Sequence, residues 1–100
     1  LDQAKAGHFA YVGDSVLGCN ANLGAGTKLA NLKLDGREVR YKDPELSEVR
    51  SSKLRKFGSI IGDHVQIGCN AVLSPGSLLL PKTRVMPCQH HHGTLRPHIH

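Results

Sequence analysis

The chain has 100 residues, of which 39% are hydrophobic, 21% charged and 4% aromatic, and its formal net charge is +5. This composition favours one small globular domain over a disordered segment. The charge favours anionic partners such as phosphates, and no nucleic acid is expected because aromatic platforms and a basic helix are missing. No apolar run approaches the ~20 residues that span a bilayer, so no membrane partner is expected. Three cysteines without a signal peptide predict free thiols and a cytoplasmic location.

A six-residue repeat begins at residue 11 and resumes at residue 61. Its first position is occupied by Tyr11, Leu17, Leu23, Leu29, Ile61, Ile67, Leu73, Leu79 and Val85. Its fifth position is small or β-branched, and is occupied by Ser15, Ala21, Thr27, Val65, Ala71, Ser77 and Thr83. A period of six matches neither the α-helix nor the alternating strand, so it indicates a solenoid.

This repeat predicts an all-β fold, a left-handed parallel β-helix of about three coils with three units in each coil. The first position would point inward, the small fifth position would fit a narrow prism, and Gly, Asn–Ala and Asp–Ser would make the corners, where some residues need positive φ. The alternative is a small antiparallel β-domain with Gly-rich turns. Exposed coil ends and the small size of one prism predict a homotrimer.

The expected organisation is a β-helix domain over residues 1–87, with a charged insertion over 35–56, followed by a tail over 88–100. The insertion is either a solvated loop or a loop that reaches toward a neighbouring subunit or an anionic ligand. Alternation over residues 36–42 indicates a short strand there, and hence a possible hairpin. Regular phase resumes near Phe57.

The tail breaks the six-residue phase and is rich in histidine, with His90, His91, His92, His98 and His100. We expect a flexible or edge-covering segment rather than a metal site. Consecutive histidines present their rings in different directions, whereas a zinc site needs fixed tetrahedral ligands. No metal is predicted.

Residues 5–31, KAGHFAYVGDSVLGCNANLGAGTKLAN, and residues 57–68, FGSIIGDHVQIG, carry a resemblance to a known family. They resemble the acetyltransferase domain of the bifunctional bacterial enzyme that makes UDP-N-acetylglucosamine, an N-acetylglucosamine-1-phosphate uridylyltransferase and glucosamine-1-phosphate acetyltransferase. Related sugar-phosphate nucleotidylyltransferases carry a similar C-terminal hexapeptide domain. The resemblance implies acyl transfer from acetyl-coenzyme A to the amine of a sugar phosphate, at the interface of a homotrimer.

The resemblance assigns His8 as the general base that deprotonates the amine. A histidine with a pKa near ~6.5 can accept a proton at neutral pH, and a protonated ammonium cannot attack a thioester. The alternative is that His8 is a solvated residue ahead of the first regular coil.

The other roles implied by the resemblance belong to substrate and cofactor contacts. The positions that match are Tyr11 and Asn22 for holding the sugar, Asn31 near the reacting groups, and Ala25 and Cys69 for contacting coenzyme A. As alternatives, Asn22 and Asn31 are ordinary corner residues, since Asn tolerates the left-handed region. Cys69 repeats the unit position of Cys19, which favours a structural role.

Two departures from the family pattern predict an incomplete active site. The family's phosphate-gripping basic residues lie upstream of its KAGH motif, where this sequence has only a few residues. The coils that complete the coenzyme A groove would follow Val85, where the repeat breaks. Besides an acyltransferase, the sequence therefore also predicts a non-catalytic trimerisation or sugar-phosphate-binding module, or an orphan fragment of a sugar nucleotidylyltransferase.

Overall fold

Short strands and sharp corners alternate through the part of the chain that the computed structural model describes, residues 4–7, 10–45 and 48–97. The strands there are β1 (Lys5–Ala6), β2 (Tyr11–Val12), β3 (Val16–Leu17), β4 (Asn22–Leu23), β5 (Lys28–Leu29), β6 (Arg40–Lys42), β7 (Val49–Ser51), β8 (Ile60–Ile61), β9 (Gln66–Ile67), β10 (Val72–Leu73), β11 (Leu78–Leu79), β12 (Arg84–Val85), β13 (His90–His91) and β14 (Thr94–Leu95).

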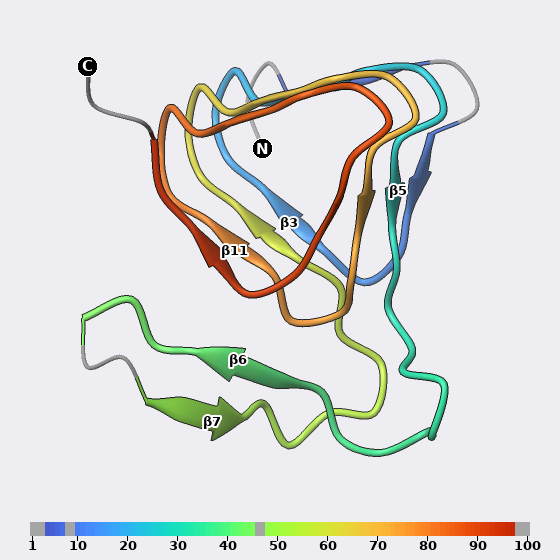
Figure 1. The fold of residues 1–100 in the computed structure, drawn as a ribbon, viewed down its shortest axis with the longest axis vertical. Coiled ribbons are helices and arrows are strands. Elements are labelled where there is room, and N and C mark those ends of the chain that lie inside the picture. The colour runs from blue at the N-terminus through green and yellow to red at the C-terminus, as the bar shows by residue number, and fades with distance from the viewer. Residues whose placement is uncertain (1–3, 8–9, 46–47, 98–100) are drawn as a thin grey trace.

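Three parallel four-stranded sheets, ordered β1-β4-β9-β12, β2-β5-β10-β13 and β3-β8-β11-β14, form the sides of a triangular coil within these residues (Figure 1). The prediction of a left-handed parallel β-helix is confirmed. Each sheet has four strands, one more than about three coils would supply, because segments at both ends of the repeat also pair.

The register of the sheets places three six-residue units in each regular coil. Gln66 pairs with Arg84, 18 residues further along the chain. Within the two-residue strands of the three parallel sheets, the first residue faces outward and the second stacks on its equivalents in neighbouring coils. The core consists of Ala21, Leu23, Leu29, Ile61, Val65, Ile67, Ala71, Leu73, Leu79 and Val85. Stacked aliphatic and small side chains thus fill the prism without aromatic residues.

The small fifth position is buried as predicted, and its hydroxyls bond to backbone inside the prism. Thr27, Ser77 and Thr83 are almost completely inaccessible. Thr27 Oγ1 donates to Gly68 O of the next coil at 3.1 Å, and Ser77 Oγ donates to Ser74 O at 2.7 Å. Such bonds lower the cost of burying a hydroxyl, whereas the buried Ser59 Oγ has no hydrogen-bond partner among the described residues.

The corners use the left-handed backbone region, as the Asn and Gly residues predict. Asn20 and Asn70 have φ of 56° and 59°, and Gly26 and Gly76 have φ of 74° and 83°. Asn adopts this conformation at lower cost than most residues because its side chain is short and polar. Other corners use residues that the sequence did not suggest, namely His64, Lys82 and Cys88.

The first unit of the repeat is out of phase with the prediction. Tyr11 is paired with Lys28 and is 51% exposed, whereas Val12 is paired with the buried Leu29. Val12 therefore takes the inward position that Tyr11 was expected to hold. The first coil is one residue shorter than the later ones, since Tyr11 and Lys28 are 17 residues apart, and a Tyr side chain is too large for the narrow prism.

The charged insertion leaves the coil at the corner between β5 and β8. Asn22 and Gln66, which pair in adjacent coils, are 44 residues apart rather than 18. The extra residues contain an antiparallel hairpin, β6 and β7, which Figure 1 shows beside the prism. The hairpin that the alternation over residues 36–42 indicated is therefore present.

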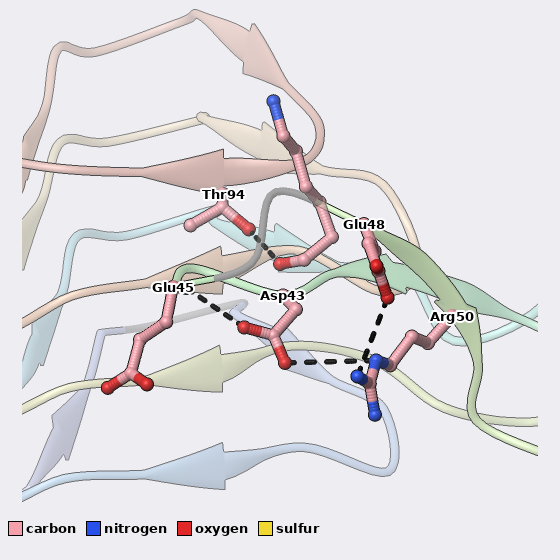
Figure 2. A network of polar contacts seen from close by, with 6 residues as sticks. Asp43, Glu45, Glu48, Arg50 and Thr94 are labelled. Atoms are coloured by element: carbon pink, nitrogen blue, oxygen red, sulfur yellow. Dashed lines mark hydrogen bonds and ion pairs between the residues drawn. The ribbon is translucent and has the colours of Figure 1, made fainter.

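The hairpin is fastened to the last coil of the solenoid. Thr94 Oγ1 donates to Lys42 O at 2.6 Å, and Arg96 donates to Pro44 O. Figure 2 shows this junction beside a set of polar contacts within the hairpin, in which Arg50 lies 3.9 Å from Asp43 and 3.5 Å from Glu48. The insertion thus contacts a part of the chain about fifty residues away.

Of the two forms expected for the tail, flexible or edge-covering, the described part takes the edge-covering one. Over residues 88–97 it continues the solenoid, with β13 paired to β10 and β14 paired to β11. His91, half-buried, occupies an inward position, and a polar residue is tolerated there because the last coil is covered by the prism on one side only. The segment covers the edge of two sheets. His98 and His100 lie outside the described residues.

No helix long and apolar enough to cross a membrane occurs in the part of the chain that the structure describes.

Candidate functional site

Asn31 is held between two polar side chains from the first coil. Its Oδ1 accepts a hydrogen bond from Tyr11 OH at 3.3 Å, and its Nδ2 donates to Asp14 Oδ2 at 2.6 Å. The side chain packs directly over Gly13, where an added Cβ would come within 2.7 Å of Asn31 Cγ. The YxGD motif therefore has a structural explanation, because Tyr11 and Asp14 hydrogen-bond the Asn31 amide and Gly13 leaves room for it.

This arrangement fixes the orientation of the Asn31 amide. An Asn carries two N–H donors and one carbonyl acceptor, and its orientation follows from its partners. A carboxylate on one side can only accept, so the nitrogen must face Asp14. The second Nδ2 hydrogen has no partner among the described residues and is available to an oxygen of a ligand.

The predicted base, His8, lies outside the described residues, as does its neighbour Phe9. The residues on either side are in place: Gly7 N donates to Leu23 O at 2.7 Å, and Ala10 N donates to Gly7 O at 3.1 Å. The assignment of His8 as a base stays a prediction.

Asn22 lies on a different sheet from Tyr11 and is not part of the Asn31 cluster. It is the outward residue of β4, and its Nδ2 donates to Gln66 Oε1 at 3.2 Å on the neighbouring strand. This hydrogen bond joins two amide side chains on neighbouring strands of one outer face of the prism. Within one chain, the predicted sugar-holding residues therefore occupy two separate places.

Ala25 and Cys69, the two predicted coenzyme A contacts, are brought together at one corner. Ala25 O accepts a hydrogen bond from the N–H of Asn70, the residue after Cys69, at 2.8 Å. Gly24 allows this close approach, since a Cβ there would lie 2.6 Å from Cys69 N. Both side chains are exposed, and Cys69 is a free thiol. The corner thus presents a narrow ledge of small side chains.

An open, partly apolar hollow is lined by the two chain neighbours of Asn31, although not by Asn31 itself. Its volume is about 580 Å³, and Ala30 and Leu32, the chain neighbours of Asn31, line it together with Leu34, Pro75 and His92. Sequence reasoning missed this hollow because the insertion and the tail had to be placed in space to form it. It also missed Gly13 and Asp14 as site residues, although the YxGD spacing contained the signal.

Two histidines in the described part of the tail, His90 and His91, bond to other polar side chains. His90 Nε2 lies 2.6 Å from Ser74 Oγ, and His91 Nε2 lies 3.0 Å from Gln89 Oε1. In the described part of the chain, no group of three or more His, Cys, Asp or Glu residues is arranged to hold a metal ion.

Comparison with known proteins gives several relatives. The chain is 39% identical over 89 residues to the bifunctional sugar-1-phosphate nucleotidylyltransferase/acetyltransferase of Sulfurisphaera tokodaii, a match that covers 87% of this chain and 21% of that protein. It is 37% identical over 76 residues to the bifunctional protein GlmU of Methanocaldococcus jannaschii, covering 76% of this chain and 18% of that protein. It is 39% identical over 69 residues to the bifunctional protein GlmU of Prochlorococcus marinus, covering 69% and 11%.

The chain is thus homologous to one segment of these bifunctional proteins, which confirms the resemblance of residues 5–31 and 57–68 to their hexapeptide-repeat domain. It spans about a fifth of the length of the first of these relatives. Some relatives are archaeal, so the similarity extends beyond bacteria. No protein-family model matches the chain.

Proposed function

We propose that the chain is an N-acyltransferase domain that transfers the acetyl group of acetyl-coenzyme A to the amine of an amino sugar phosphate. Relatives named as nucleotidylyltransferase/acetyltransferases support this class of reaction. The single observation that carries the proposal is the Asn31 amide, held by Tyr11 and Asp14 over Gly13 in the segment that also contains His8. A polar side chain fixed by two partners, with one donor left over, is preorganised for a reacting group.

In this reaction the amine nitrogen bonds to the thioester carbonyl carbon, the carbon–sulfur bond breaks, and coenzyme A leaves as its thiol. We assign His8 as the group that takes the proton from the amine and returns it to the departing sulfur. We assign the free Nδ2 hydrogen of Asn31 to the carbonyl oxygen, where negative charge develops as the nitrogen adds.

The corner of Ala25 and Cys69 is the proposed contact for coenzyme A. Its small exposed side chains leave room for an extended chain to lie against the backbone. Pro87 continues the ledge in the next coil, where Gly68 again allows close approach. Contact with an extended, uncharged chain requires no charged residue at the corner, and Ala25, Cys69 and Pro87 are all uncharged residue types.

We further propose that the domain works as a homotrimer. Asn22 and Ala25 are separated from Asn31 within one chain, so a second copy would have to bring the two groups to one ligand. The outer face of the sheet β3-β8-β11 supports self-association, because Val16 and Ile60 are 50% and 43% exposed there. Apolar residues on an outward sheet face are stabilised when another surface covers them. Free cysteines fit the proposed cytoplasmic location.

The catalytic proposal is tested by thiol release from acetyl-coenzyme A in the presence of glucosamine 1-phosphate. We expect His8→Asn to reduce the rate by about 10²–10⁴-fold, the usual contribution of a general base. The matched control is His64→Asn, at an exposed corner where φ is 57° and Asn is tolerated. Wild-type protein that releases no thiol, or a His8→Asn variant as fast as wild type, would overturn the assignment.

Light scattering tests the assembly. Val16→Lys should reduce the trimer to a monomer, whereas Val49→Lys, at an equally apolar and 63% exposed position on the hairpin, should not. A monomeric wild type at micromolar concentration contradicts the trimer. A trimer that binds glucosamine 1-phosphate but releases no thiol would instead favour the non-catalytic sugar-phosphate-binding module, which the limited length of the match also allows.

A further inference from the structure

Three arginines from two segments of the insertion line one open hollow beside the hairpin. Arg37 follows the turn at Asp35–Gly36, Arg40 begins β6, and Arg55 lies just after β7. The hollow has a volume of about 700 Å³ and is also lined by Lys33. The chain therefore gathers cationic groups that are up to 22 positions apart, numbered 33 to 55 in the sequence.

The two carboxylates of the hollow are already engaged. Asp35 accepts from the backbone N–H of Arg37 at 2.9 Å and lies 3.8 Å from Lys33 Nζ. That backbone N–H holds the pKa of the Asp35 carboxyl below its usual range, and the charges of Lys33 and Arg37 act in the same direction. Glu38 accepts from Ser51 Oγ at 2.6 Å.

The guanidinium groups, in contrast, are not bonded to other side chains within the described residues. None of Arg37, Arg40 and Arg55 has a hydrogen bond or ion pair from its side-chain nitrogens to another described residue. Like charges grouped around one hollow repel one another, and an anion between them removes that repulsion. The planar donor fork of Arg matches the oxygens of phosphate and carboxylate, often with two bonds at once.

The backbone that carries these arginines is fixed in place. Val39, between Glu38 and Arg40, is completely buried, its N–H donates to Leu54 O at 2.7 Å and its carbonyl accepts from Ser52 N at 2.9 Å. Arg40 O lies against the Gly76 corner of the prism. A binding site gains affinity when the elements that present its side chains are rigid before the ligand arrives.

The hollow is also continuous with the partly apolar hollow described above. Lys33, Asp35 and Arg40 line both this hollow and the partly apolar one beside Ala30 and Leu32. An anionic group at the arginines could thus belong to a ligand whose uncharged part lies beside Ala30 and Leu32. This continuity favours an organic phosphate over a free inorganic ion.

We infer that Arg37, Arg40 and Arg55 form a binding site for the phosphate group of an organic phosphate, at the junction of the hairpin and the prism. The site goes beyond acyl transfer, because it depends on its own residues and would bind whether or not the domain is an active transferase. The phosphate could come from a sugar phosphate or from the nucleotide end of an acyl carrier.

Isothermal titration of the whole chain with inorganic phosphate tests the site. We expect saturable binding to wild type, weakened about tenfold or more by Arg40→Gln and by Arg55→Gln, because each removes a charged hydrogen-bond donor. The matched control, Arg84→Gln, makes the same change of charge at an exposed outward position of β12 and should alter binding less than twofold. Binding that is absent, or that Arg84→Gln weakens equally, overturns the site.

Competition then distinguishes the two sources. Glucosamine 1-phosphate and adenosine 3′,5′-bisphosphate are each titrated against bound inorganic phosphate. Displacement by one of them supports the site and identifies the source, and the same ligand should bind Arg40→Gln more weakly than wild type. Displacement by neither contradicts the assignment to an organic phosphate. The measurement needs no turnover, so a chain that fails the thiol-release assay can still pass this one, and the reverse also holds.

Discussion

The prism and the hairpin differ in how their residues are used. In the central coils, the inward residues of β4, β5, β8, β9, β10 and β11 are buried, and the same six-residue unit recurs. In the hairpin, every residue of β7 is exposed, and Val39 is the buried hydrophobic residue among those described between 31 and 56. The prism therefore supplies most of the apolar burial, and the insertion that contains the hairpin supplies the three arginines of the proposed phosphate site. Apolar burial and the proposed phosphate recognition are thus separated between the two regions, and each can be perturbed independently.

The largest expected effect is the loss of a core side chain from the prism. Leu73 is completely buried in the central coils, so Leu73→Ala should lower the free energy of unfolding by about 2–5 kcal/mol, from lost burial and the cavity that remains. The same change at Leu34, which is fully exposed at the base of the hairpin, should shift it by less than about 0.5 kcal/mol. Urea denaturation measures both. Equal losses at the two positions would contradict the separation between prism and hairpin.

The next effect concerns the joint between the two regions. Gly76 has φ of 83°, and a Cβ there would lie 2.0 Å from Arg40 O, so Gly76→Ala must both strain the corner and displace the hairpin. We expect a loss of about 3 kcal/mol or more, combining the left-handed backbone cost with a steric clash. At Gly36, with φ of 68° and no atom within 4 Å of an added Cβ, the loss should be about 1–2 kcal/mol. If thermal unfolding gives equal shifts for both variants, the hairpin does not rest on this corner.

The prism could be predicted from the sequence because its rules are local and repeat. An inward aliphatic residue such as Leu23 or Leu73, and a corner Asn such as Asn70, are each specified within one unit of six. Tyr11 was misplaced because a coil that is one residue shorter shifts the phase without changing the residue pattern around it. The edge-covering role of the tail was one of two expectations, but its strands were not predicted, because β13 lies at the open end, where the inward position does not need an aliphatic residue.

The candidate site was predicted only in part. The resemblance singled out Tyr11 and Asn31, and these residues do contact each other. The support beneath them, Gly13 and Asp14, depends on the register of coils that are 17 residues apart along the chain. Arg37 and Arg55 come together only because the insertion folds back on itself. The charged residues of the insertion follow no fixed period, so their pattern in the sequence does not predict that fold.

A smaller effect is expected where the hairpin joins the last coil. Thr94→Val keeps the shape of the side chain and removes the hydrogen bond to Lys42 O, so the unfolding free energy should fall by about 1 kcal/mol. Hydrogen exchange should rise at amides of β6 and β7 and stay unchanged in β9 and β10. A uniform rise across the prism would show instead that the hairpin and the coils unfold as one unit.

The smallest effect is expected within the hairpin network of Figure 2. Arg50 faces Asp43 at 3.9 Å and Glu48 at 3.5 Å, but its side chain is 47% exposed, so solvent and salt screen both pairs. Arg50→Gln should change the unfolding free energy by less than about 1 kcal/mol, and the change should shrink further at 1 M salt. Phosphate binding should be unaffected, because Arg50 does not line the arginine hollow. A variant that lost phosphate affinity as Arg40→Gln does would mean that general positive charge on the hairpin, rather than the three converging arginines, attracts the anion.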